Sequence, residues 1–188
     1  MYKKVLVLIA DGFEEVEALT PVDLLRRVNI EAVMVSCSEK LVVKGAHGVK
    51  VVCDMLLDNL EDEDVEDAFG IVLPGGMPGA ENLKNSEGVK YIIKDMMSKK
   101  KLVAAICAAP IVLAETDVID GRRITSYPGF QDELKAAEYM EDSVVLDDNL
   151  ITARGPAIAM DFALAIVEYL CGREKRHSLA NEVLRNMI

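Results

Sequence analysis

Short apolar runs alternate with amphipathic stretches along most of the 188-residue chain. Apolar runs of about four to eight residues bounded by turn residues are typical of buried parallel strands, whereas a 3.6-residue period indicates helices. The pattern predicts strands at 3–10, 30–37, 69–73, 102–106 and 124–126. It predicts hairpins at 42–54 and 143–153, and helices at 14–27, 87–99, 131–138, 157–171 and 175–187, with one more starting at Pro110.

Strands that alternate with helices predict an α/β fold with a mostly parallel central sheet covered by helices on both faces. We find no repeat, linker or low-complexity segment, so residues 1–188 are expected to form a single domain. Pro21 is expected to kink or split the first helix. The acidic stretch 57–67 is expected to be a loop or short helix, and 74–79 a glycine-rich turn.

Three unusual segments directly follow predicted strands, at 11–17, 74–79 and 106–108. The carboxyl ends of parallel strands share one edge of a sheet, and ligands bind in the crevice beyond that edge. The three segments are therefore expected to converge on a functional site.

Cys107 is the strongest candidate in that group, within the stretch LVAAICAAP. Pro110 fits the first turn of a helix, so Cys107 should lie where a strand bends into a helix. The helix dipole and free N–H groups there predict a lowered thiol pKa, and the N–H of Ala108 would face an oxyanion. This resembles a nucleophile elbow with Cys in place of Ser. The alternative is a buried structural cysteine.

Glu17 lies one helical turn into the first predicted helix, where it could meet Cys107 and share a proton with it. For Glu14 and Glu15 we favour a solvated first turn that complements the helix dipole. Gly75 and Gly76 could supply an oxyanion N–H, or could simply form a tight turn.

Three further side chains are candidates for the pocket. Arg154 either binds an acidic substrate group or forms an ion pair, and we favour the ion pair. Tyr127 follows a short strand, but a phenol is neutral near pH 7 and is a poor replacement for a histidine base. His47 lies at a hairpin tip and His177 in a charged helix, so both are expected at the surface.

Composition narrows the functional classes. The formal net charge of -11 disfavours nucleic acid and anionic membranes as partners. The four cysteines are widely spaced without a CxxC pair, which indicates free thiols in a reducing, cytoplasmic compartment. The two histidines are far apart, so neither a zinc site nor another cofactor is expected.

The segments DGFEEVEALTPVDLLRR, VLPGGMPGAENL, AAICAAP and ARGP with FALAIVEYL together resemble the ThiJ/PfpI superfamily, and within it the Parkinsonism-linked protein deglycase (DJ-one) branch. The resemblance spans the chain and implies a flavodoxin-like three-layer sandwich, similar to class I glutamine amidotransferases, and a homodimer with a stress-related role. By position, Cys107 matches the family's reactive cysteine and Glu17 the carboxyl that hydrogen-bonds it. Gly76 and Ala108 match the backbone donors of the oxyanion pocket.

Two departures from the family pattern stand out. Tyr127 occupies the position of the pocket histidine, and Ala108 replaces the histidine that follows Cys in the protease-like branch. Arg27 and His47 fall where the family has arginines near the dimer interface.

Three hypotheses follow from the resemblance and the residues. In the first, Cys107 acts on a reactive dicarbonyl or on a glycated protein or amino acid, as a glutathione-independent glyoxalase or deglycase. In the second, oxidation of Cys107 makes the protein a peroxide sensor or a redox-regulated chaperone. The third and weakest is an amidase or peptidase.

Overall fold

The computed structural model describes residues 3–185, and its centre is a seven-stranded sheet in that part of the chain. The strand order is β10-β11-β7-β6-β1-β2-β5, and every neighbouring pair is parallel except β10 and β11. The expectation of a mostly parallel sheet is thus confirmed. The sheet strands are β1 (Lys4–Ile9), β2 (Glu31–Ser36), β5 (Met55–Leu56), β6 (Ala68–Leu73), β7 (Leu102–Ile106), β10 (Val144–Asp147) and β11 (Leu150–Ala153).

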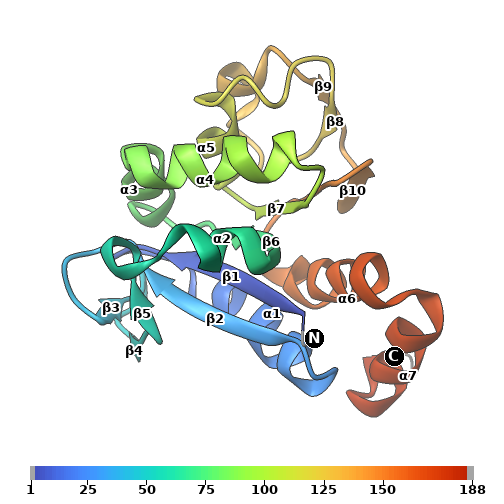
Figure 1. The fold of residues 1–188 in the computed structure, drawn as a ribbon. Helices are drawn as coiled ribbons and strands as arrows, with labels where there is room; N and C mark the ends of the chain where they lie inside the picture. The colour runs from blue at the N-terminus through green and yellow to red at the C-terminus, as the bar shows by residue number, and fades with distance from the viewer. Residues whose placement is uncertain (1–2, 186–188) are drawn as a thin grey trace.

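Helices cover both faces of this sheet, as expected (Figure 1). The core on one face includes side chains from α1 (Glu15–Arg27), α6 (Ala159–Cys171) and α7 (Arg173–Glu182). The core on the other face includes side chains from α2 (Asp62–Asp67), α3 (Gly79–Lys84), α4 (Glu87–Ser98) and α5 (Pro110–Ala114). Because both faces are covered, β7 is buried along its whole length, which explains its uninterrupted apolar sequence.

Smaller elements complete the chain. An antiparallel hairpin of β3 (Val42–Lys44) and β4 (Lys50–Val52) lies near the carboxyl ends of β1 and β2 (Figure 1). A parallel pair is formed by β8 (Arg123–Ile124) and β9 (Glu138–Tyr139). Short 3-10 turns occur at η1 (Leu57–Asn59), η2 (Gln131–Leu134) and η3 (Pro156–Ile158). No helix among the described residues is both long and apolar enough to cross a membrane.

The structure differs from several local expectations, or meets them only in part. The helix α1 continues through Pro21 without a break, so the proline does not split it. The expected helix at 131–138 is only a short 3-10 turn, because Glu138 and Tyr139 pair with β8 instead. The glycine-rich turn at 74–79 leads into the unpredicted helix α3. The last helix ends at Glu182, and the predicted end at Met187 lies outside the described residues.

Candidate functional site

The three segments singled out in the sequence meet at one edge of the sheet. They follow β1, β6 and β7, which are neighbours in the strand order, so their carboxyl ends lie side by side. Backbone hydrogen bonds join two of the loops: the N–H of Glu14 donates to the carbonyl of Gly75 at 2.9 Å, and that of Gly79 to Gly12 at 3.1 Å. Glycine is required here because a Cβ at Gly12, Gly76 or Gly79 would collide with the opposing backbone.

Cys107 lies at the end of β7 with φ of 64°, a left-handed conformation that is rare for a residue with a side chain. Its N–H donates to the carbonyl of Ala153 and its carbonyl accepts from the N–H of Tyr127, so neighbouring segments hold the bend on both sides. Non-glycine residues in this conformation occur mainly where the surrounding structure enforces them, and they cluster at functional sites. The geometry therefore matches the strand-to-helix elbow expected from the sequence.

The polar groups around the thiol come from separate segments. The backbone N–H groups of Ala108 and Gly76 and the carboxyl of Glu17 lie close enough to the Cys107 thiol to shift its pKa. Glu17 is fully buried, and its Oε2 accepts a hydrogen bond from the N–H of Gly75 at 2.9 Å. The structure thus brings together five of the predicted site residues: Glu17, Gly75, Gly76, Cys107 and Ala108.

The pKa of the Cys107 thiol does not follow the expectation. Burial, followed by the charge of Glu17, raises this pKa to about 12, while the N–H groups of Ala108 and Gly76 act in the opposite direction. Burial also raises the pKa of Glu17 to about 7, against the lowering effect of the nearby Cys107 thiol and of the hydrogen bond from the N–H of Gly75. The expectation that the helix dipole lowers the thiol pKa was therefore wrong. The dipole argument leaves out two larger effects that raise this pKa, namely the burial of the sulfur and the negative charge of Glu17.

The two groups are best described as one acid–base pair. They release one proton near neutral pH and keep the second until strongly alkaline pH. Over that range the pair carries one negative charge and one proton, shared between the Glu17 carboxyl and the Cys107 sulfur. In the form with this proton on the Glu17 carboxyl, the site presents a thiolate nucleophile and a proton donor at the same time.

The remaining pocket candidates are arranged differently. Tyr127 is about half-exposed, and its ring packs beside Gly155, where an added Cβ would approach the ring to 3.2 Å. Arg154 forms no ion pair within residues 3–185. Its Nη1 instead donates to the carbonyl of Glu141 at 2.9 Å, so the favoured ion pair was wrong.

Glu15 and His47 form a contact that the sequence did not reveal. His47 is exposed at the hairpin tip, as expected, but its Nδ1 lies 2.9 Å from Oε2 of Glu15. Glu15 is 7% exposed, so the expectation of a solvated first turn was wrong for this residue. The two residues are 32 positions apart, so local sequence patterns do not predict this contact. The only signal in the sequence is that a carboxylate and an imidazole can pair.

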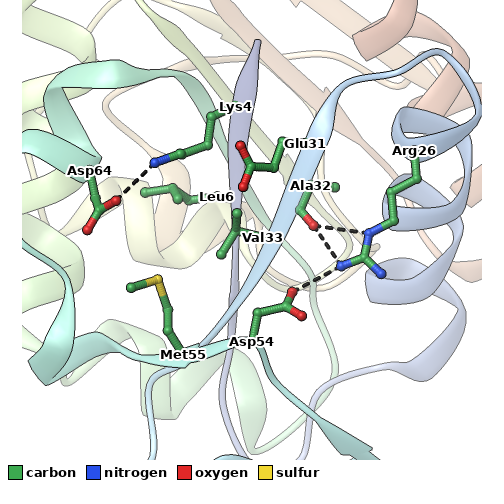
Figure 2. Close-up of a pocket in the computed structure, with 9 residues that line it drawn as sticks. All are labelled: Lys4, Leu6, Arg26, Glu31, Ala32, Val33, Asp54, Met55 and Asp64. Carbon is green, nitrogen blue, oxygen red and sulfur yellow. Dashed lines mark hydrogen bonds and ion pairs between the residues drawn. The ribbon is translucent and has the colours of Figure 1, made fainter. Parts of the chain in front are cut away.

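A groove of about 520 Å³ lies at the opposite end of β1 and β2 (Figure 2). Its floor is apolar, and its charged side chains are largely paired with one another: Lys4 with Asp64 at 2.9 Å, and Arg26 with Asp54 at 3.0 Å. Lys4 opens β1, whereas the loops around Cys107 follow the carboxyl ends of the strands. The groove is therefore separate from the candidate active site.

Comparison with known proteins agrees with this architecture. The family described as DJ-1/PfpI matches residues 3–169. The chain belongs to the DJ-1/PfpI family. The resemblance noted in the sequence is thereby confirmed.

Individual relatives cover nearly the whole chain. The Parkinson disease protein 7 homolog of Danio rerio is 39% identical over 176 residues, which is 92% of each chain. A deglycase of Pyrococcus horikoshii is 36% identical over 156 residues, covering 82% of this chain and 91% of that protein. The oxidized DJ-1 of Toxoplasma gondii superposes with a TM-score of 0.90 at 34% identity, covering 97% of this chain and 98% of that one.

Proposed function

We propose that the protein is a cysteine-dependent enzyme of the stress response that acts on reactive dicarbonyls or early glycation adducts. The observation that carries this proposal is the Cys107 thiol, held at a left-handed bend between two backbone N–H groups and the buried Glu17 carboxyl. The name of the Pyrococcus horikoshii relative, a deglycase, supports the same class of substrate.

The proposed reaction with methylglyoxal begins when the sulfur of Cys107 attacks the aldehyde carbon. A C–S bond forms, and the carbonyl electron pair moves to oxygen, where the N–H groups of Gly76 and Ala108 stabilise the charge. Glu17 gives its proton to this oxygen and produces a hemithioacetal. The resulting carboxylate removes the proton from the former aldehyde carbon and returns one to the neighbouring carbon, while the proton of the new hydroxyl moves to the oxygen on that neighbouring carbon. The thioester so formed is hydrolysed by water, which releases lactate and restores the thiol.

Steady-state assays test this reaction. Wild type should convert methylglyoxal to lactate over many turnovers, and Cys107→Ser should abolish turnover. The matched control is Cys171→Ser, because Cys171 is also partly exposed but lies at the end of α6. Turnover that persists in Cys107→Ser would refute the proposal. Tyr127→His adds an imidazole beside the site, and we expect it to increase the rate.

A redox role for the same thiol is the second candidate. One observation favours it: the solved relative from Toxoplasma gondii is described as oxidized. Intact-mass measurement after mild peroxide would then show oxygen added to wild type and Cys171→Ser, but not to Cys107→Ser. Selective oxidation without any lactate formation would favour a peroxide sensor or redox-regulated chaperone over the enzyme.

An amidase or peptidase is the weakest candidate, because Ala108 and Tyr127 stand where a histidine base would be needed.

We also propose that the protein is a cytoplasmic homodimer. Apolar side chains on and beside the hairpin are exposed and suit a surface that a second copy would cover: Leu41, Val42, Val49 and Val52. Arg27 pairs with Asp23 and Glu182 within the same chain, so any role at the interface would be additional. Val52→Asp should shift the sedimentation coefficient from dimer to monomer, and an unchanged coefficient would contradict this surface.

A further inference from the structure

Three side chains that can bind metals meet where the β3–β4 hairpin contacts the start of α1. Nδ1 of His47 lies 2.9 Å from Oε2 of Glu15 and 3.5 Å from Oε2 of Glu14. One ligand atom from each residue lies within 4.8 Å of the other two. These are a nitrogen and two oxygen donors on two segments that are far apart in the sequence.

Glu15 is held in place by groups other than His47. Its Oε1 accepts hydrogen bonds from the backbone N–H groups of His47 at 2.8 Å and Val49 at 3.3 Å. The N–H of Ala46 also donates to the carbonyl of Phe13 at 2.8 Å, which fixes the hairpin tip against the start of α1. Oε2 of Glu15 is therefore presented to the imidazole in a fixed orientation, as outer contacts orient the ligands of metal sites.

Glu14 is the least satisfied member of the cluster. Its side chain is only 15% exposed, yet within residues 3–185 the polar group that approaches its carboxylate is the imidazole of His47, at 3.5 Å. Two carboxylates face one imidazole, so the cluster keeps an excess of negative charge whatever the protonation state of His47. The N-terminal end of the α1 dipole contributes only a partial positive charge, which is smaller than the charge of two carboxylates.

We propose that Glu14, Glu15 and His47 bind a zinc ion. Zinc binds imidazole nitrogen and carboxylate oxygen at about 2.0–2.2 Å in a tetrahedron, which places neighbouring ligand atoms about 3.3–3.5 Å apart. The separations of 2.9 and 3.5 Å from Nδ1 of His47 are close to these values, and all three ligand atoms lie within 4.8 Å of one another, so side-chain rotation can complete the geometry. The His47 side chain is 70% exposed in the single chain, so this chain leaves the fourth position open to water or to a donor from a second copy that covers the hairpin. This site does not depend on the chemistry proposed for Cys107.

The test uses the fact that the chain has only two histidines, His47 and His177. Zinc is titrated into the ¹⁵N-labelled full chain, and the imidazole nitrogens are followed by long-range ¹H–¹⁵N NMR. Calorimetry then gives zinc affinity for wild type, His47→Gln, Glu14→Gln and the matched control His177→Gln. Because His47 is exposed, His47→Gln should fold normally, which circular dichroism verifies.

The proposal expects zinc to shift Nδ1 of His47 and to leave His177 unchanged. Affinity should fall at least about tenfold in His47→Gln and in Glu14→Gln, and should remain unchanged in His177→Gln. Equal shifts of both histidines, or an unchanged affinity in His47→Gln or Glu14→Gln, would overturn it. Zinc binding that disappears in Cys107→Ser but survives in His47→Gln would also overturn it and assign the metal to the thiol.

Discussion

Replacing Glu17 with glutamine should reduce the pH dependence of folding stability. The carboxyl is fully buried, and burial raises its pKa from an ordinary value of 4.5 to about 7. Between these two values the unfolded chain has released the proton while the native chain still holds it. The native state therefore loses stability as the pH rises through this window.

The size of the effect follows from the shift in pKa. One unit corresponds to about 1.4 kcal/mol, so a rise to about 7 corresponds to about 3 kcal/mol in total. Most of this loss, about 2 to 3 kcal/mol, falls between pH 5 and pH 8. Glutamine has nearly the same shape but no ionisable proton, so this contribution disappears in Glu17→Gln.

Urea unfolding at pH 5 and at pH 8 measures the effect. The free energy of unfolding of Glu17→Gln minus that of wild type should be about 2 to 3 kcal/mol higher at pH 8 than at pH 5, because wild type alone loses this stability. Titrating groups that do not interact with Glu17 cancel in this difference. The exposed Glu39 provides the matched control, because Glu39→Gln should change stability equally at both values. A pH-dependent difference below about 1 kcal/mol for Glu17→Gln would refute the reasoning.

Three other predictions follow from the site and its surroundings. Alkylation of Cys107 by iodoacetamide should rise with pH, with a midpoint near 7, and then level off, since the Glu17–Cys107 pair releases its first proton there. A rate that keeps rising tenfold per pH unit to pH 9 would contradict the shared proton. Gly75→Ala should destabilise the fold by about 1–3 kcal/mol and slow alkylation, because the new Cβ would lie 2.7 Å from Cβ of Cys107. As a control, Gly88→Ala in α4 should leave alkylation unchanged. If Gly88→Ala slowed alkylation as much as Gly75→Ala, the contact with Cys107 would not be the cause. Lys100 has φ of 53° just after α4, so Lys100→Gly should stabilise the fold by about 0.5–1 kcal/mol in urea unfolding. A loss of stability would count against strain at this position.

Features set by local sequence were predictable. The apolar run ending in Cys107, followed by Pro110, carries the signals of a strand and a helix start within nine residues of one another. The convergence of the three loops followed from the rule that parallel strands share one carboxyl edge. The burial of Glu17 could be anticipated because it lies one turn into a helix that begins at this edge.

Features that depend on distant contacts were not predictable. The thiol pKa was wrong in direction because it depends on how deeply the fold buries Cys107 and how close it brings Glu17. The contact between Glu15 and His47 depends on where the hairpin folds back, which local periodicity does not encode. Arg154 binds a backbone carbonyl, a type of acceptor that every residue offers and that sequence therefore cannot single out.

The two edge strands of the central sheet, β5 and β10, affect whether copies of this protein aggregate at high concentration. One edge strand, β5, is only two residues long. At the other, β10, the guanidinium groups of Arg123 and Arg122 donate to the carbonyls of Leu146 and Asp147. An unpaired edge strand is a template to which a strand of another chain can add. Edge strands that are short or covered by charged side chains resist this addition. The edge strands of this sheet should therefore not nucleate fibrils, even at high protein concentration.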